Sequence, residues 1–409
     1  MYKPFRFSYK NGVLSVKSYR YFEDLSDLSL AYTVERNGEV IESKVIGAMK
    51  IAPCATKRYT IFPKDRTFDG VTTLTLRVFQ NGQTDWAEQG YTVGTEQFIL
   101  SDDLQKKPCE QFGAILTESA LAYTVRCGET VYTVGRRSGL IESVLDNGKE
   151  MLSAPITPSV WRAPIDNERQ VKGEWYQKGL DRILCDLRAI EASSDGKCAE
   201  IKAELVLGAV ALAPLARLSV TYTFAEETGV RIDCHAKIEN APWMLPRFGF
   251  RFTLPEGMED VRYFGYGPME SYEDKRQAAH LSYFRTTATA NFENYIRPQE
   301  NGAHAFCRMA DVTSVQGHGL FFAGKSFSFS VSHYSPEQLT AIAHHYELVP
   351  EKETTVFIDY RNSGVGSHSC GPALNPLYRI SEKEFDFTFA FKPVLSGNIS
   401  PFDEYAKMI

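Results

Sequence analysis

The sequence lacks the marks of several large protein classes. It has no run of apolar residues long enough to span a membrane, and its first residues lack the apolar core of a signal peptide. None of the eight cysteines forms a Cys-x-x-Cys pair, so zinc-ribbon and dithiol redox motifs are excluded. The net charge of −6 gives no reason to expect nucleic acid as a partner. Scattered free thiols suit a reducing compartment, and we expect a cytoplasmic protein.

Length and composition indicate a globular chain with more than one domain. At roughly 100–200 residues per domain, the 409 residues predict two or three domains. Hydrophobic residues at 43% and charged residues at 23% are typical of globular proteins. A core of the expected size needs no disulfide or metal to hold it. Aromatic residues reach 12%, which suits β-strands and also sugar-binding surfaces; for any single aromatic, the strand role is the more frequent.

Alternation of apolar and polar residues is the dominant pattern, and half-buried antiparallel strands need this period of two. The apolar residues of three such runs are Leu218, Val220, Tyr222 and Phe224; Val230, Ile232, Cys234, Ala236 and Ile238; and Phe385, Phe387, Phe389 and Phe391. Four Asn-Gly pairs, at 11–12, 37–38, 81–82 and 147–148, supply the positive φ angles of tight hairpin turns. Strands joined by hairpins predict an all-β fold built of sandwiches rather than a βα barrel.

Two short helices interrupt this pattern. Ser335 precedes Pro336, and Gln338 follows at the third helical position, which predicts a capping box. We expect this helix to run over Leu339 and to end near His344 and His345. A second short helix is expected around 174–183.

A polar stretch around 101–112 predicts a domain boundary. Its first part is charged and ends in Pro108. The first domain, 1–103, then has the size of an immunoglobulin-like sandwich. The second, 112–400, is too long for one ordinary sandwich and shows no internal repeat, so a single very large antiparallel sandwich is expected.

Five phrases occur in a fixed order through this second domain. They are WRAPIDN at 161–167, YFGYGPMESY at 263–272, YIRPQENG at 295–302, FSVSHYS at 329–335 and DYRNSGVGSHSC at 359–370. Together they resemble the C-terminal region of the β-galactosidases of glycoside hydrolase family 2. The first domain resembles, through weaker matches at 19–26 and 85–88, the sandwich that precedes this region in the family.

The resemblance implies an immunoglobulin-like sandwich followed by a supersandwich related in fold to galactose mutarotases. In that family a preceding barrel domain carries the two carboxyl groups of retaining hydrolysis, so we assign no catalytic residue, metal or cofactor to this chain. The partners implied are that barrel region, in the same chain or in a separate large subunit, and a galactoside substrate such as lactose. We also expect an oligomer, no nucleic acid and no membrane.

Several polar residues of the five phrases are candidates for sugar binding. Sugar hydroxyls form hydrogen bonds with side chains of the kinds found at Arg162, Asp166 and Asn167. The alternative is that these three side chains pair with one another to fix a loop. Glu300 stands next to an Asn-Gly turn and is more often a carboxylate that bonds local amides. His333 is in phase with buried aromatics and is more often an inward residue with satisfied hydrogen bonds.

The loop that ends the last phrase has a stronger connection with the substrate. In some family members a Trp of the supersandwich reaches the mouth of the barrel and stacks on substrate. Aligned through Gly364 to Gly366, that position is Cys370, which lacks a stacking face. The neighbours Ser367, His368 and Ser369 are then left to shape the pocket. A structural turn through Cys370 is the equally weighted alternative.

Three functions remain open at this point. The first is the non-catalytic part of a β-galactosidase, either a fragment or a small subunit, inactive by itself. The second is an independent sugar epimerase on the mutarotase-like fold, with Glu270, Glu300 and His333 as candidates for its acid and base. The third is a carbohydrate-binding or assembly module.

Overall fold

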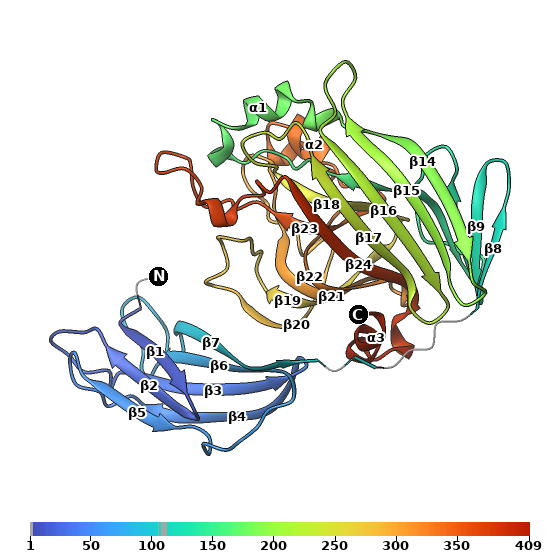
Figure 1. Cartoon of the computed structure of the whole chain (residues 1–409). Coiled ribbons are helices and arrows are strands. Elements are labelled where there is room, and N and C mark those ends of the chain that lie inside the picture. The colour runs from blue at the N-terminus through green and yellow to red at the C-terminus, as the bar shows by residue number, and fades with distance from the viewer. Residues whose placement is uncertain (1–2, 105, 108–112) are drawn as a thin grey trace. The chain divides into compact units, whose positions relative to one another are not determined.

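The computed structural model describes residues 3–104, 106–107 and 113–409, and nearly all of its regular structure is β-strand (Figure 1). The chain divides into two compact units, Met1–Gln105 with His280–Tyr283, and Lys106–Ala279 with Phe284–Ile409. The predicted domain limits, 1–103 and 112–400, stay predictions, and Pro108 and Cys109 lie outside the described residues. No helix in the described part of the chain is long and apolar enough to cross a membrane.

The first unit is a sandwich of two antiparallel sheets. One sheet has the order β1 (Phe5–Lys10), β2 (Val13–Ser18), β5 (Thr56–Thr60), and the other has the order β4 (Glu39–Ala48), β3 (Leu28–Arg36), β6 (Gly70–Gln80), β7 (Thr92–Asp103). Side chains that alternate inward on these strands, among them Leu14, Leu30 and Leu76, are fully buried between the sheets. This arrangement confirms the predicted immunoglobulin-like class.

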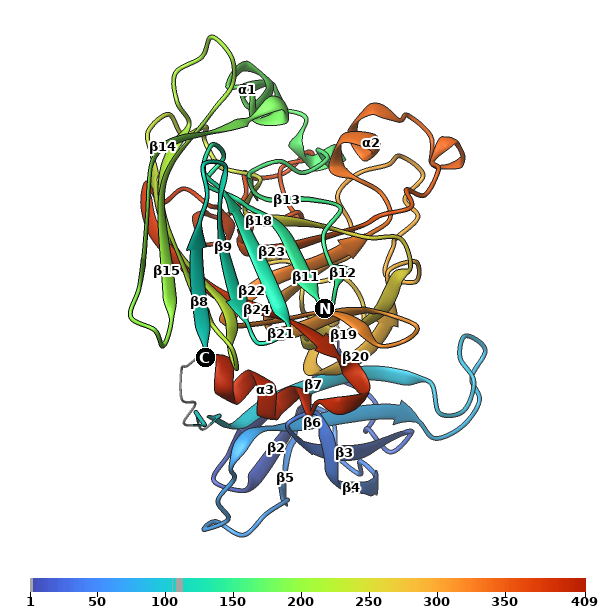
Figure 2. The ribbon, with the colours of Figure 1, turned by 90° about the vertical axis from the view of Figure 1, so that its right-hand side faces the viewer.

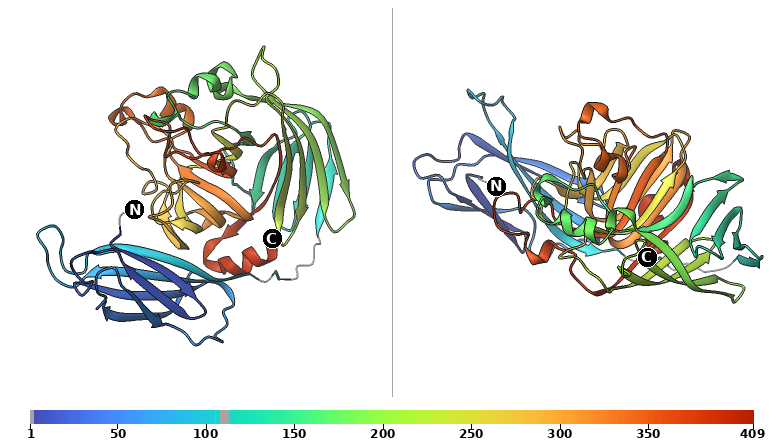
Figure 3. Two further views of the ribbon diagram at one scale, coloured as in Figure 1. Left: turned by 60° about the vertical axis from the view of Figure 1, so that its left-hand side comes forward. Right: turned by 90° about the horizontal axis from the view of Figure 1, so that it is seen from above.

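The second unit contains a large antiparallel sheet and a smaller one, which share a single core (Figures 1, 2 and 3). The path of the large sheet is β13 (Ala154–Ser159), β18 (Arg247–Leu254), β23 (Thr354–Asn362), β22 (His318–Ser332), β24 (Glu384–Leu395), β17 (Gly229–Ile238), β16 (Ala216–Ala225), β15 (Ala199–Gly208), β14 (Leu184–Ser194). A branch adds β21 (Ala303–Ser314), β19 (Met258–Gly267) and β20 (His280–Thr287), of which His280–Tyr283 are counted with the first unit. The small sheet has the order β12 (Lys149–Glu150), β11 (Ile141–Asp146), β10 (Thr130–Gly135), β9 (Ala122–Cys127), β8 (Ala114–Glu118).

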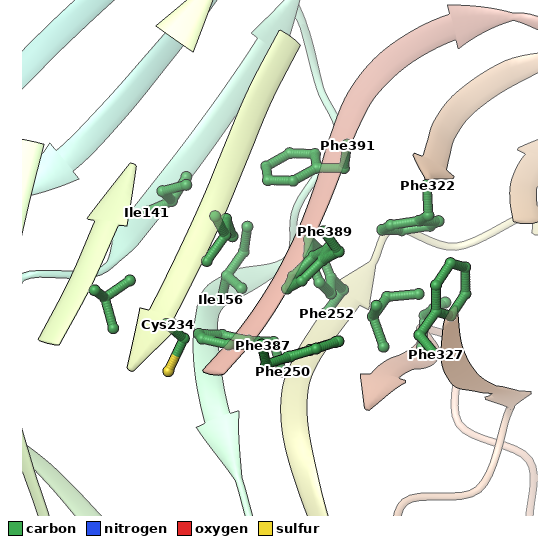
Figure 4. Close-up of a cluster of buried hydrophobic side chains, with 14 of the residues drawn as sticks. Ile141, Ile156, Cys234, Phe250, Phe252, Phe322, Phe327, Phe387, Phe389 and Phe391 are labelled. Carbon is green, nitrogen blue, oxygen red and sulfur yellow. The ribbon is translucent and has the colours of Figure 1, made fainter. Parts of the chain in front are cut away.

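Aromatic side chains fill much of the core of this unit (Figure 4). Phe252 of β18 lies edge-on to Phe322 of β22 and to Phe391 of β24, with ring centroids 5.0 and 5.2 Å apart. The three alternating runs expected in the sequence form β16, β17 and β24, and all their apolar members are buried. The all-β prediction is therefore confirmed, and it rests on the period of two.

The two predicted helices of the second unit are shorter than expected, and a third helix, α3, was not predicted. They are α1 (Lys172–Gln177), α2 (Pro336–Ala341) and α3 (Pro401–Met408), with short 3-10 turns at Asp166–Glu168, Leu180–Arg182, His345–Glu347, Pro376–Tyr378 and Ser396–Asn398. The helix expected around 174–183 is split, because Gly179 takes a left-handed conformation between α1 and the next turn.

The helix predicted to end near His344 ends earlier, because Ile342 is extended. Ser335 caps it by accepting from the Gln338 backbone N–H at 3.3 Å. The Gln338 side chain donates instead to the Val349 carbonyl, so only half of the predicted capping box forms.

One of the four turn predictions differs from the structure. Asn11, Asn37 and Asn147 have the expected positive φ, as do their glycines, but the pair at 81–82 does not. That pair opens a long connection, 81–91, between β6 and β7. Ser101 to Asp103, assigned to the boundary, belong to β7 because they pair with β6.

At Gly249, strand β18 approaches strand β23 very closely. A Cβ at Gly249 would collide with the Asp359 side chain and the Ile358 carbonyl, whereas a Cβ at Gly173 of α1 meets nothing within 4 Å. We expect Gly249→Ala to lower the free energy of unfolding by about 3 kcal/mol, the upper end of the usual cost of overpacking. Gly173→Ala should cost nothing, since alanine favours helix. Urea denaturation of both variants measures this, and equal stabilities would contradict it.

We expect the fold to lose stability in acid because of the buried side chain of His304. It is buried, its Nε2 lies 2.7 Å from Asn291 Oδ1, and its ring stacks on Tyr263. Burial lowers the pKa of His304 from 6.5 to about 4. Between these values the unfolded chain binds a proton that the folded chain does not, so stability is lost as pH falls through this window, by up to about 3 kcal/mol.

The measurement compares wild type with His304→Gln, which keeps a donor for Asn291 and does not titrate. Urea denaturation at pH 7 and pH 4.5 should show the wild type losing more stability than the variant. Parallel losses would show that His304 does not contribute.

Candidate functional site

Four connecting segments of the second unit, which follow β13, β19, β20 and β23, meet at one pocket of about 270 Å³. The Glu300 backbone N–H donates to the Ala163 carbonyl at 3.1 Å, and the Asn167 side chain donates to the Val365 carbonyl at 2.6 Å. The segments that follow β13, β20 and β23 are thus joined. The lining residues are Ile165, Asp166, Asn167, Glu270, Tyr272, Lys275, Tyr295, Gln299, Glu300, Val365 and Gly366. Three of them, Asp166, Asn167 and Glu300, are sugar-binding candidates from the sequence, and Glu270 is a candidate acid or base.

Glu270 organises one wall of this pocket. Its side chain is 5% exposed and forms an ion pair with Lys275. It also accepts hydrogen bonds from the Tyr295 hydroxyl and, at 2.9 Å, from the Gly302 backbone N–H. A carboxylate with three donors around it holds its neighbours in fixed positions.

Tyr272 contributes a buried hydroxyl that has no hydrogen-bond partner of good geometry within the described residues, although the Ala303 backbone lies near it. The side chain is 2% exposed and lines the pocket. Burial raises the pKa of Tyr272 well above its usual value, so the hydroxyl keeps its proton. Because an unpaired buried hydroxyl costs about 1–3 kcal/mol, a group in the pocket that pairs with it gains that energy back.

Arg162 is fully buried behind the pocket and fixes its backbone. It donates to the Ser363 carbonyl at 2.6 Å and also to Asn362 Oδ1. Its other terminal nitrogen forms an ion pair with Glu168, which in turn accepts from the Ile165 backbone N–H at 2.9 Å. The contacts of Arg162 therefore match the alternative in which it fixes a loop rather than binds sugar. Its partners, however, are not Asp166 or Asn167.

A second buried arginine, Arg247, supports Glu300. Its Nη1 lies 3.6 Å from Glu300 Oε2, and its Nη2 lies 2.6 Å from Asp359 Oδ2. Asn362 completes the arrangement by donating to Glu300 Oε1 at 3.1 Å. Burial raises the pKa of Asp359 to about 7, although Arg247 opposes the rise. Glu300 is therefore held by an arginine and an amide at the base of the pocket.

The loop that starts at Gly364 is held by Asp274. Both oxygens of its carboxylate accept backbone N–H groups, from Val365 and Gly366, at 2.8 Å. A Cβ at Gly364 would lie 2.6 Å from the Asp274 carboxyl carbon, so glycine is needed there. Sequence reasoning missed Asp274, because the tie spans 91 residues and only the glycines of the loop suggested a close approach.

The other loop candidates continue from this tie without lining the pocket. His368 has a positive φ of 83°, and its ring lies 5.5 Å from that of Trp243. The Ser369 carbonyl accepts from Arg169 at 3.4 Å. Ser367 is partly exposed, and Cys370 is exposed. These four stay predictions for a contact made by the loop at the rim.

His333 is not brought to the pocket. Its Nε2 lies 2.6 Å from Glu259 Oε2, and its Nδ1 lies 3.2 Å from the Glu353 carbonyl. Of the three candidates for an epimerase, Glu270 and Glu300 line the pocket and His333 does not. In the part of the chain that the structure describes, no three His, Cys, Asp or Glu side chains gather closely enough to hold a metal ion.

Two family models match the chain. "Beta galactosidase small chain" matches residues 126–391, and "Beta-galactosidase, domain 4" matches residues 14–101. The first model covers most of the second unit, and the other lies within the first unit.

Curated relatives match both units. A β-galactosidase of Actinobacillus pleuropneumoniae is 30% identical over 95% of this chain and 38% of its own length. One of Staphylococcus xylosus is 30% identical over 74% of this chain and 31% of its own length. One of Priestia megaterium is 28% identical over 94% of this chain and 38% of its own length. The chain thus spans less than two-fifths of the relatives it matches.

Among solved structures, galactose 1-epimerase from Lactobacillus acidophilus is similar with a TM-score of 0.37 and 13% identity, over 69% of this chain and 98% of that one. A similarity of this size carries no argument about function. The family match is of a different order, because the small-chain model alone covers well over half of the residues. The chain belongs to the β-galactosidase small chain family.

Proposed function

We propose that this chain is the non-catalytic C-terminal part of a β-galactosidase that hydrolyses terminal β-D-galactosides such as lactose. A barrel region, in the same chain or in a separate subunit, would supply the catalytic carboxylates of a retaining mechanism. The chain would complete the substrate pocket and the assembly. Support comes from the two family models and from relatives whose length is more than twice that of this chain.

Two of the three carboxylates that line the pocket, Glu270 and Glu300, are poorly suited to catalysis. Retaining hydrolysis needs one carboxylate free to attack carbon and one acid free to move a proton. Glu270 is committed to Lys275 and to the Gly302 N–H, and Glu300 is committed to Arg247 and Asn362. Both act as fixed hydrogen-bond acceptors, which supports a binding role.

The observation that carries the binding proposal is a pocket lined by carboxylates and amides, with the unpaired hydroxyl of Tyr272 buried in its wall. Sugar hydroxyls both donate and accept hydrogen bonds, so they pair with a phenol, a carboxylate and an amide at once. Asp166, Asn167 and Glu300 are the proposed partners from the sequence. The loop from Ser367 to Cys370 would meet the substrate from the rim.

An independent epimerase is the second candidate. It needs an acid and a base on opposite sides of a sugar ring. The pocket brings Glu270 and Glu300 together, which favours it, but both are held by cations and His333 is bound to Glu259 elsewhere. Epimerase activity is therefore the weaker proposal.

The compartment is also part of the proposal. All seven cysteines in the described residues are free thiols. Free thiols support a reducing compartment, and we propose the cytoplasm.

The purified chain should not hydrolyse nitrophenyl β-galactoside, because Glu270 and Glu300 are both held by cations and Asp166 alone cannot supply the pair of free carboxyl groups that retaining hydrolysis needs. Release of nitrophenol, measured at high protein concentration, should equal that of buffer. A preparation of Glu270→Gln serves as the control for contaminating enzyme. Turnover by the wild type that this variant loses would contradict the non-catalytic role.

Tyr272→Phe should have two opposite effects. It removes an unpaired buried hydroxyl, so the sugar-free chain should gain about 1 kcal/mol of stability. It should also weaken binding of methyl β-galactoside about tenfold, because the sugar loses a hydrogen bond in a buried site.

NMR titration gives the affinity and urea denaturation gives the stability. Tyr266→Phe is the matched control, since Tyr266 lies near the end of β19 and does not line the pocket. Equal sugar affinity of wild type and Tyr272→Phe would remove Tyr272 from the binding site.

A further inference from the structure

One end of the first unit gathers three connections between strands. These are 19–27 after β2, 49–55 after β4 and 81–91 after β6. Asn81 joins two of them, because its backbone N–H donates to the Asp27 carbonyl at 2.9 Å and its side chain donates to the Ser26 carbonyl at 2.8 Å. The Cys54 N–H donates to the Arg20 carbonyl at 3.0 Å and joins the third. The β6–β7 connection projects past the strand ends (Figure 2).

Five aromatic side chains on two of these connections are exposed to solvent. They are Phe22 at 96%, Tyr21 at 77%, Trp86 at 65%, Tyr91 at 52% and Tyr19 at 43%. We call this group the aromatic end. Scattered single aromatics are ordinary on a surface, but a group of five at one end of a sandwich is typical of an interaction site.

The connections that carry these rings are held rigidly. Arg20 forms a two-pronged ion pair with Asp27, at 2.6 and 2.8 Å, and donates to the Asp24 carbonyl at 2.8 Å. In the other connection, the Ala87 N–H donates to Thr84 Oγ1 at 3.0 Å. Because the connections are already ordered, a partner that covers the rings pays little conformational entropy.

The rings of Trp86 and Tyr91 meet edge to face, with centroids 5.5 Å apart. Such large side chains on a fixed frame provide the anchors from which protein interfaces gain most of their affinity. The arrangement is therefore suited to a protein surface with complementary apolar pockets.

The charges around the aromatic end indicate the kind of partner. Within the three connections, Glu23, Asp24, Asp85 and Glu88 are exposed, and Lys50 is the exposed lysine. From the adjoining strands, Lys17 lies over the Tyr19 ring and Arg77 donates to the Gly90 carbonyl. Arg20 is neutralised by Asp27. A second copy of this chain would bring like charges together, which is unfavourable. A partner with an apolar surface and a basic rim would complement the aromatic end.

We propose that the aromatic end docks onto the catalytic region of the β-galactosidase to which this chain belongs. The inference rests on the proposed function and adds the surface through which the two parts join. The relatives have more than half of their length outside the matched part, which provides a partner large enough to cover the five rings. Docking would bury Phe22 and Trp86 at the centre and place the acidic residues at the rim.

The experiment uses the whole chain and, as probe, the part of the Actinobacillus pleuropneumoniae β-galactosidase that its match to this chain leaves out. Sedimentation velocity should show a complex at protein concentrations on the order of 10 µM. The double variant Phe22→Ser with Trp86→Ser should bind at least about tenfold more weakly. The control is Val40→Ser with Val45→Ser on β4, two exposed apolar residues outside the three connections. Thermal melting confirms that both variants fold.

A loss of affinity in the aromatic variant alone supports the proposal. Equal affinity of all three proteins, equal losses in both variants, or no complex of the wild type at about 100 µM would overturn it. Self-association that depends on Phe22 would also overturn it, since the occupant would then be a second copy.

Galactoside hydrolysis by the mixture separates this inference from the proposed function. A complex that forms through the aromatic end without any gain in turnover over the probe alone would overturn the role in completing the pocket. The docking surface would stand in that case.

Discussion

Two arginines, Arg162 and Arg247, are buried in the second unit, and the walls of the pocket depend on their ion pairs. Arg162 connects the segment after β13 with the end of β23, and Arg247 connects β18 with β23 and with Glu300. Each charge is paired and hydrogen-bonded, as buried charges must be. Removing either arginine would leave carboxylates buried without a partner, at a cost of several kcal/mol. The same ion pairs therefore hold the walls of the pocket and the strands of the large sheet, so the pocket forms only when the sheet folds.

This dependence connects the proposed non-catalytic role of the chain with its proposed role in substrate binding. A carboxylate that is held by ion pairs and hydrogen bonds is poorly placed to transfer protons, and Glu270 and Glu300 are held in this way. What they provide is a fixed set of acceptors beside the neutral hydroxyl of Tyr272. A fixed polar pocket loses little energy to reorganisation when a sugar enters. In the proposed enzyme, the reacting groups would come from another region, and this chain would hold the substrate still and join that region through the aromatic end.

The sequence predicts the strands well because strand formation leaves a local record. Val220 and Cys234 are buried as their alternation requires, and Ser335 caps α2 as its spacing to Gln338 requires. The prediction of a tight turn at Asn81 was wrong because the type of turn depends on how far apart the two strands are held. Two residues alone do not encode that distance. Asp274 and Tyr272 escaped prediction for the same reason: their roles arise from segments about 90 and 30 residues away that meet only in the folded chain.

The most direct test of the account is a crystal structure of the chain with methyl β-galactoside. The account predicts a sugar in the pocket beside Glu300 and Asn167, with one hydroxyl within hydrogen-bond distance of Tyr272 Oη. A pocket that holds only ordered water bonded to Tyr272 at saturating sugar would contradict it.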